Sequence, residues 1–116
     1  MRDIEGPIHR SILAYLSMAL KNHGANCSPV WHTPNNPRSN VAGARLKALG
    51  MRKGFPDLSF LCNGKFYCIE AKPEGQYLRP SQKEWLGYIE AAGGFFAVCR
   101  SIYDAEETLR EWGLLK

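Results

Sequence analysis

Residues 57–72 read DLSFLCNGKFYCIEAK. Two apolar runs, residues 57–61 and 65–71, lie on either side of Asn63-Gly64. Asn-Gly between apolar runs is the strongest short-range signal of a β-hairpin, because both central residues of a type I′ turn need a positive φ. The stretch therefore predicts two antiparallel strands that are joined by a two-residue turn.

The turn also sets which residues face each other across the hairpin. Counting outward from Asn63 and Gly64, Cys62 faces Lys65 and Asp57 faces Glu70. The Cβ atoms of such a pair lie roughly 4.5–5.5 Å apart, and like charges directly opposite each other destabilise a sheet. A hairpin selected only for stability would not place two carboxylates there.

Three arrangements would accommodate the two carboxylates. Their pKa values could rise until the pair shares one proton. A divalent cation could bind between them, because carboxylate oxygens suit Mg²⁺. They could also form a surface cluster in which Lys72 pairs with Glu70, since exposed charge pairs are common. Lys72 lies two residues after Glu70 and therefore points to the same face of the strand. The apolar neighbours Cys68 and Ile69 favour a buried strand over a surface cluster.

The residues before the hairpin predict a helix and an irregular segment. Apolar residues at helical spacing predict a helix from about residue 7 to 22, which Gly24 ends. A short strand could follow at residues 29–32. The Pro- and Asn-rich residues 33–40 should form a loop, and a short helix could lie within residues 42–49.

The residues after the hairpin predict a helix, a strand and a helix. Ser81 as N-cap and Glu84 three residues later form a capping-box pattern for a helix over residues 81–92. Residues 95–99 are apolar and predict a buried strand, and residues 103–112 predict a last helix. Because a helix links the second hairpin strand to the strand at 95–99, these two should be parallel. The order predicts an α/β fold with a mixed central sheet.

Length and composition predict one compact domain. The chain has 116 residues, which is enough for a single domain spanning residues 1–116 and not for two. Hydrophobic residues make up 45% and charged residues 22%, as in ordinary globular proteins. No run of 18 apolar residues occurs, so we expect no membrane contact. The first residues lack the apolar region of a secretory signal, so we expect a cytoplasmic protein.

The cysteines give no sign of a metal or redox motif in the sequence. They are Cys27, Cys62, Cys68 and Cys99, and no two of them have the C-x-x-C spacing of zinc or thioredoxin-like sites. Free cysteine is usually buried and packs as a small hydrophobe. We therefore expect all four to be buried, reduced thiols.

Basic charge is concentrated in the first half of the chain. The net charge is +4, but residues 6–56 contain no Asp or Glu, and their local charge is +7. Such a segment suits a polyanion, because Lys and Arg release counterions from phosphates; the alternative is a solvated basic face without a partner. The basic residues of this segment are Arg10, Lys21, Arg38, Arg45, Lys47, Arg52 and Lys53.

Pro56-Asp57 followed by Glu70-Ala71-Lys72 resembles the PD-(D/E)xK signature of restriction-endonuclease-like nucleases. The surrounding segments are similar to the VRR-NUC branch of that superfamily, including its stand-alone phage and bacterial members; they are residues 52–58, 66–72, 81–82 and 92–94. The resemblance runs from about Glu5 to Trp112. It implies a restriction-endonuclease-like fold with an αβββαβ-type core, in which helices flank a mixed central sheet with a catalytic hairpin.

The resemblance also implies roles for individual residues. Asp57, Glu70 and the backbone carbonyl of Ala71 would bind the metal. Lys72 would position or activate the attacking water. Gln82, at the start of the helix after the hairpin, matches a glutamine that the branch places near the site, so we count it with the catalytic residues.

An acidic residue on the first helix often completes such sites, and Glu5 is the candidate, although Pro7 suggests that the helix begins after it. The implied activity is hydrolysis of DNA phosphodiester bonds with Mg²⁺ or Mn²⁺, leaving a 5′-phosphate and a 3′-hydroxyl. Stand-alone members resemble Holliday junction resolvases, which implies branched or flapped DNA as substrate and a homodimer. No small-molecule cofactor is implied.

Other readings of the sequence stay open. The chain could be a catalytically inactive DNA-binding module of the same fold, or a metal-dependent hydrolase of a small phosphate compound. For phosphate contacts we select the basic residues near the hairpin, which are Arg38, Arg45, Lys47, Arg52 and Lys53.

The histidines and one tryptophan have two interpretations each. His9 lies one helical turn from Glu5 and could be a second metal ligand, although an exposed or capping histidine is more usual. His23 and His32 have no partner at ligand spacing, so we expect structural or surface roles. Trp31 could touch DNA, but burial in the core is the more common role of tryptophan.

Overall fold

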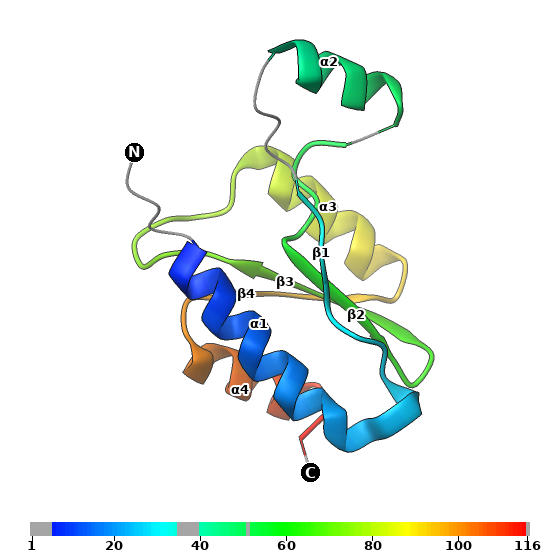
Figure 1. The fold of residues 1–116 in the computed structure, drawn as a ribbon, viewed down its shortest axis with the longest axis vertical. Helices are drawn as coiled ribbons and strands as arrows, with labels where there is room; N and C mark the ends of the chain where they lie inside the picture. The colour runs from blue at the N-terminus through cyan, green and yellow to red at the C-terminus, as the bar shows by residue number, and fades with distance from the viewer. Residues whose placement is uncertain (1–5, 35–39, 51, 116) are drawn as a thin grey trace.

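The structure is a computed structural model that describes residues 6–34, 40–50 and 52–115. Along the chain, helices precede and follow the predicted hairpin (Figure 1). The elements are α1 (Gly6–Leu20), the 3₁₀ helix η1 (Lys21–Asn26), β1 (Trp31–His32), α2 (Asn40–Ala48), β2 (Leu58–Cys62), β3 (Lys65–Ala71), α3 (Pro80–Ala91), β4 (Phe95–Cys99) and α4 (Ile102–Glu111). None of the helices in the described ranges is long and apolar enough to cross a membrane.

The strands form one mixed sheet in the order β1-β2-β3-β4. The pairs β1–β2 and β2–β3 are antiparallel, whereas β3 and β4 are parallel because α3 connects them. Figure 1 shows α1 and α4 on one side of the sheet and α3 on the other. This arrangement confirms the predicted mixed α/β fold.

The hairpin has the predicted register. Leu58 pairs with Ile69 and Cys62 pairs with Lys65. Asn63 and Gly64 have φ values of 52° and 79°, as a type I′ turn requires. The first strand of the hairpin, β2, begins at Leu58, one residue later than predicted, so Asp57 lies directly before it.

Apolar side chains cover both faces of the sheet. On one face, Ile12 and Leu16 of α1 and Leu109 of α4 pack on sheet residues such as Leu58 and Ile69. All five are fully buried, and burial of one such side chain stabilises a protein by about 1.5–3 kcal/mol. A smaller cluster on the other face contains Cys68, Ile89 of α3 and Phe96. The sheet is thus fixed from both sides, which makes it a rigid support for residues at its end.

The start of α3 differs from the prediction. Ser81 and Glu84 do not form the expected capping box; the N-cap residue is Arg79, and Pro80 occupies the first helical position. Proline suits this position because its φ is already helical and its missing N–H would have no partner there. Gln82 takes the capping role instead, since its Oε1 accepts a hydrogen bond of 2.8 Å from the Arg79 N–H.

The expectation of four reduced thiols is wrong for two of the cysteines. Cys27 and Cys62 form a disulfide, and the two residues face each other across an isolated antiparallel bridge between η1 and the end of β2. This pairing brings together residues 35 positions apart, so the spacing rules for cysteine motifs could not reveal it. Cys68 and Cys99 are buried and free, as expected.

Candidate functional site

The two carboxylates lie together at the end of the hairpin farthest from the turn. The Asp57 N–H donates a hydrogen bond of 3.2 Å to Glu70 Oε1. The Ala71 N–H donates one of 3.0 Å to Asp57 Oδ2. Each carboxylate therefore accepts a backbone N–H from the opposite strand, and these two bonds extend the hairpin past Leu58. The facing arrangement predicted from the turn is present.

The position is electrostatically unfavourable for Glu70. Its side chain is buried, with 4% of the residue exposed. Burial and the neighbouring Asp57 carboxylate raise the pKa of Glu70 to about 8, and Lys72 opposes this shift only in part. Without a further cation, the ionised form of Glu70 is therefore unfavourable at this position.

Lys72 is the third charged residue at this end of the sheet. It is 3% exposed, and its backbone N–H donates to the Cys99 carbonyl with 3.1 Å between the two atoms, which ties the end of β3 to β4. Within the described part of the chain, Lys72 forms no salt bridge. Because Lys72 and Glu70 are both buried, they do not form an exposed surface pair.

Gln82 connects α3 to the carboxylates. Its Nε2 donates a hydrogen bond of 3.2 Å to Glu70 Oε2, while its Oε1 accepts from the Arg79 N–H. The two bonds fix which end of the amide faces Glu70, so the start of the helix orients the side chain. The sequence placed Gln82 near the site only through the family resemblance, and the geometry agrees with that placement.

The loop before Asp57 packs tightly on the start of α3. Gly54 has a φ of +90°, and a Cβ added there would lie 2.6 Å from the carbonyl carbon of Ser81. Only glycine fits this contact. In the same loop, the Lys53 carbonyl accepts a hydrogen bond of 3.1 Å from Trp85 Nε1. Both contacts hold the segment that leads into Asp57 against the helix that carries Gln82.

Two histidines, His9 and His32, lie beside Asp57. The spacing of residues in the sequence did not predict the contact of His32. His32 Nδ1 is 3.0 Å from the Asp57 carbonyl oxygen, which also accepts the Thr33 N–H. Since a carbonyl only accepts, Nδ1 carries the proton of this bond. The His9 ring packs edge-on against the His32 ring with 4.7 Å between centroids. Burial lowers the pKa of His9, while the Asp57 carboxylate opposes the shift.

Most of the residues selected for DNA contact are exposed near this end of the sheet. Arg45 and Lys47 lie on α2, which projects away from the sheet in Figure 1. Arg52 and Lys53 lie on the loop between α2 and β2 and are also exposed. Arg38 and Glu5 fall outside the described residues, and so does the possible pairing of Glu5 with His9.

Trp31 is not a core residue, contrary to the more common role expected for it. It is 39% exposed, because β1 is a two-residue strand at the edge of the sheet. Its ring begins a row of aromatic rings that continues through Phe66, Phe55, Trp85 and Tyr88, with neighbouring centroids 5.1–6.4 Å apart. We call these five residues the aromatic row. Phe55 lies two residues before Asp57, so the row passes close to the carboxylates.

The donor atoms at the site suit a hard divalent cation. Carboxylate oxygens are preferred by Mg²⁺ and Mn²⁺, and the site offers them from both Asp57 and Glu70. Burial and the Asp57 carboxylate raise the pKa of Glu70, and a cation between the two carboxylates would favour the ionised form of Glu70. The residues present therefore fit a divalent cation.

Comparisons with known proteins agree with this architecture. A solved structure described as a VRR_NUC domain protein superposes with a TM-score of 0.70 and 20% sequence identity, covering 95% of this chain and 88% of its own. The mixed sheet with flanking helices is thus a restriction-endonuclease-like fold. The family model for the VRR-NUC domain matches residues 9–102, and the chain belongs to the VRR-NUC family of nuclease-type domains. No curated protein matches the chain.

Proposed function

We propose that this chain is a Mg²⁺- or Mn²⁺-dependent endonuclease that hydrolyses DNA phosphodiester bonds. The observation that carries the proposal is the facing pair of partly buried Asp57 and buried Glu70, two carboxylates held together at the end of a rigid sheet. A bound divalent cation supplies Lewis-acid polarisation of the phosphate and makes a bound water more acidic. A purely structural role gives no reason to place a partly buried carboxylate opposite a buried one.

In this proposal the residues around the pair have separate roles. Asp57, Glu70 and the Ala71 carbonyl would hold the cation. The Lys72 ammonium orients the attacking water and offsets charge that develops on the phosphate. Gln82 is a positioning residue that orients the Glu70 carboxylate through its hydrogen bond. In-line attack of water then breaks the P–O bond to the 3′ oxygen and leaves a 5′-phosphate and a 3′-hydroxyl.

Charge supports a nucleic acid as the substrate. Arg45 and Lys47 on α2, and Arg52 and Lys53 on the following loop, are exposed on the segment that leads directly to Asp57. Contacts of these side chains with phosphates release counterions, so binding should weaken steeply with salt. A small phosphate compound bound at the carboxylates would be too short to contact these basic side chains as well.

The aromatic row, exposed at its two ends Trp31 and Tyr88 and partly buried between them, supports branched or flapped DNA within this class. Unpaired bases stack on aromatic side chains, whereas bases within a duplex are not accessible to them. The aromatic row offers such a surface, and it begins on β1 beside His32, whose ring binds the Asp57 backbone. We further propose that the chain acts on these substrates as a homodimer, which light scattering will test.

A cleavage panel tests the proposal. Linear duplex, flap, junction and single-stranded DNA are incubated with the chain in Mg²⁺, Mn²⁺ or EDTA. We expect cutting of branched DNA with either metal, none in EDTA, and none with Asp57→Asn or Lys72→Ala. Glu84→Gln, which neutralises an exposed carboxylate on α3, is the matched control and should cut normally.

Two other results would replace the proposal. Salt-sensitive DNA binding without cleavage of any substrate in either metal would identify an inactive DNA-binding module. Hydrolysis of a small phosphodiester at a rate insensitive to salt, with no DNA cutting, would identify a small-molecule hydrolase. Undiminished cutting by Asp57→Asn would remove the site from the mechanism.

A further inference from the structure

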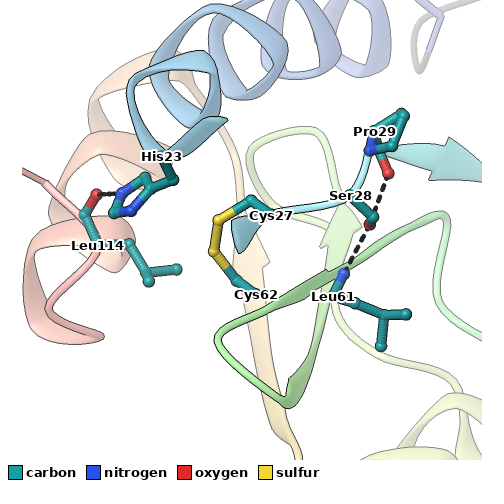
Figure 2. Close-up of a disulfide and its surroundings, with 7 residues drawn as sticks. All are labelled: His23, Cys27, Ser28, Pro29, Leu61, Cys62 and Leu114. Atoms are coloured by element: carbon teal, nitrogen blue, oxygen red, sulfur yellow. Dashed lines mark hydrogen bonds between the residues drawn. A yellow bond between two sulfur atoms is a disulfide. The ribbon is translucent and has the colours of Figure 1, made fainter. Parts of the chain in front are cut away.

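A second group of metal-ligand atoms lies at the opposite end of β2 from Asp57. One ring nitrogen of His23 and the sulfur atoms of Cys27 and Cys62 all lie within 4.8 Å of one another. Figure 2 shows the three side chains around the end of β2. Cys62 ends β2 and Asp57 precedes it, so about 16 Å of extended strand separates the two sites.

The backbone holds the two cysteines together, whether or not their sulfurs are bonded. On one side of the pair, the Asn63 N–H donates to the Asn26 carbonyl over 2.9 Å; on the other, the Ser28 N–H donates to the Leu61 carbonyl over 2.8 Å. The Ser28 hydroxyl oxygen also accepts the Leu61 N–H (Figure 2). These bonds flank the pair, whose Cα atoms are 4.1 Å apart, so reduction of the disulfide leaves two thiols side by side.

The contacts of His23 match those of a metal-binding histidine. Its Nε2 lies 2.6 Å from the Leu114 carbonyl oxygen (Figure 2). Because a carbonyl only accepts, Nε2 carries the proton, and the neutral ring keeps its lone pair on Nδ1. Histidines that bind metals almost always donate their other ring N–H to a carbonyl or carboxylate in this way, which fixes the tautomer.

We propose that the reduced chain binds Zn²⁺ through Cys27, Cys62 and His23. Two thiolates and one imidazole form a soft donor set that selects Zn²⁺ and disfavours Mg²⁺. The site is therefore chemically distinct from the carboxylate pair. Zn²⁺ prefers four ligands, and a water completes the set beside the two half-buried residues, His23 and Cys27.

The disulfide and the cation use the same sulfur atoms, so they exclude each other. In oxidation by a small disulfide such as oxidised glutathione, one thiolate attacks it and releases one glutathione thiolate. The second cysteine thiolate then displaces the other glutathione, so that one S–S bond forms in the protein and one is lost from the oxidant. Two electrons pass to glutathione, and Zn²⁺ leaves to solvent.

The other two cysteines provide a control within the same chain. Cys68 is buried, and burial raises the pKa of its thiol to about 12. Burial likewise raises the pKa of the Cys99 thiol to about 11. Neither belongs to a group of three ligand atoms in the described residues. Cys68→Ala should therefore leave Zn²⁺ binding unchanged, although it removes one thiol.

The test is a Zn²⁺ titration of the full chain, reduced with a phosphine and freed of metal, in competition with a chromophoric chelator. We expect one Zn²⁺ per chain at the cysteine site, held in competition with the chelator, for the wild type and for Cys68→Ala. His23→Gln should bind at least about 10-fold more weakly, and Cys62→Ser should not bind at the site. Circular dichroism reports whether each variant is folded.

A second measurement does not depend on variants. Co²⁺ added to the reduced wild type should give thiolate-to-metal absorption, which oxidised glutathione should abolish as the disulfide forms. Absence of this absorption and of Zn²⁺ uptake would overturn the proposal and leave the pair as a structural disulfide. Equal Zn²⁺ affinity in the wild type and folded Cys62→Ser would also overturn it. DNA cleavage enters neither measurement, so the outcome is independent of the endonuclease proposal.

Discussion

Among the residues of the candidate site, the two facing carboxylates carry the proposed chemistry. Asp57 and Glu70 each accept a backbone N–H from the opposite strand, and these bonds offset only part of the unfavourable charge. The turn residues alone predicted this pair, because a two-residue turn leaves one possible register. The contact of His32 with Asp57 was not predictable in the same way, since it depends on the pairing of β1 with β2.

The raised pKa of Glu70 predicts how stability depends on pH in the absence of metal. Burial and Asp57 raise this pKa to about 8 from 4.5. A carboxyl with a raised pKa stabilises the fold fully below its unfolded pKa, and this contribution is lost as the pH rises through the folded pKa. We expect the melting temperature in EDTA to fall as the pH rises from about 4.5 to above 8.

Thermal unfolding across this pH range provides the measurement. Glu70→Gln should flatten the dependence, and saturating Mg²⁺ should oppose the fall for the wild type, because the cation binds the charged pair in the folded state. Glu84→Gln, with an exposed side chain, should behave as the wild type. Equal slopes for wild type and Glu70→Gln in EDTA would contradict this account of the site.

At the scale of elements, the start of α3 links the helix to the site. The sequence predicted this helix but placed its N-cap at Ser81, because Ser81 and Glu84 have the spacing of a capping box. The N-cap residue in the structure is Arg79. In the structure, Pro80 begins the helix and Gln82 both caps it and binds Glu70. The cysteine pair was missed for a related reason, since contacts between distant segments leave no local pattern.

Gln82→Glu tests the link between the helix and the carboxylates. The change keeps an oxygen for the Arg79 N–H but replaces the donor to Glu70 by a third carboxylate. Partners of metal ligands typically contribute about 10–100-fold to affinity or activity. We therefore expect at least about 10-fold slower cleavage at fixed Mg²⁺ and a shifted Mg²⁺ dependence. Gln76→Glu adds the same charge on the loop after β3, and it should leave the cleavage rate and the Mg²⁺ dependence unchanged. Equal effects of the two variants would show that the contact of Gln82 with Glu70 does not matter for cleavage.

Gly54→Ala tests the packing of the loop on α3. The new Cβ would meet the Ser81 backbone at a φ that disfavours alanine. Such strain costs about 1–3 kcal/mol, and cleavage should fall because the loop carries Asp57. The matched control is Gly87→Ala on exposed α3, where a Cβ meets nothing within 4 Å; it should stabilise the fold by up to about 1 kcal/mol. Chemical denaturation measures both, and an unchanged stability of Gly54→Ala would show that the contact is not tight.

At the scale of the whole molecule, basic and aromatic side chains lie on the segments that lead to the carboxylates. The charge pattern of the sequence indicated the basic segment, but it could not show that α2 projects from the sheet (Figure 1). The aromatic row was also not predictable, because its members come from β1, β3, α3 and the loop before Asp57. Only the folded sheet brings them together.

The aromatic row predicts a preference for DNA with unpaired bases. Stacking of one base on an aromatic ring contributes about 1–3 kcal/mol. Trp31→Ala should therefore weaken binding of DNA with a single-stranded arm by about 10-fold or more, with little effect on linear duplex. Tyr103→Ala removes an exposed ring on α4, outside the aromatic row, and should change the affinity for neither DNA. Fluorescence anisotropy measures the affinity for each DNA. If Trp31→Ala lost the same affinity for both DNAs, the aromatic row would not recognise unpaired bases.

Direct measurement of bound Mn²⁺ tests whether Asp57 and Glu70 hold a divalent cation. Free Mn²⁺ has an electron paramagnetic resonance signal that is lost on binding, so a titration counts bound ions. We predict that wild type binds Mn²⁺ and that Asp57→Asn, folded by circular dichroism, loses this binding. Equal Mn²⁺ binding by the two proteins would show that the cation does not bind at Asp57 and Glu70.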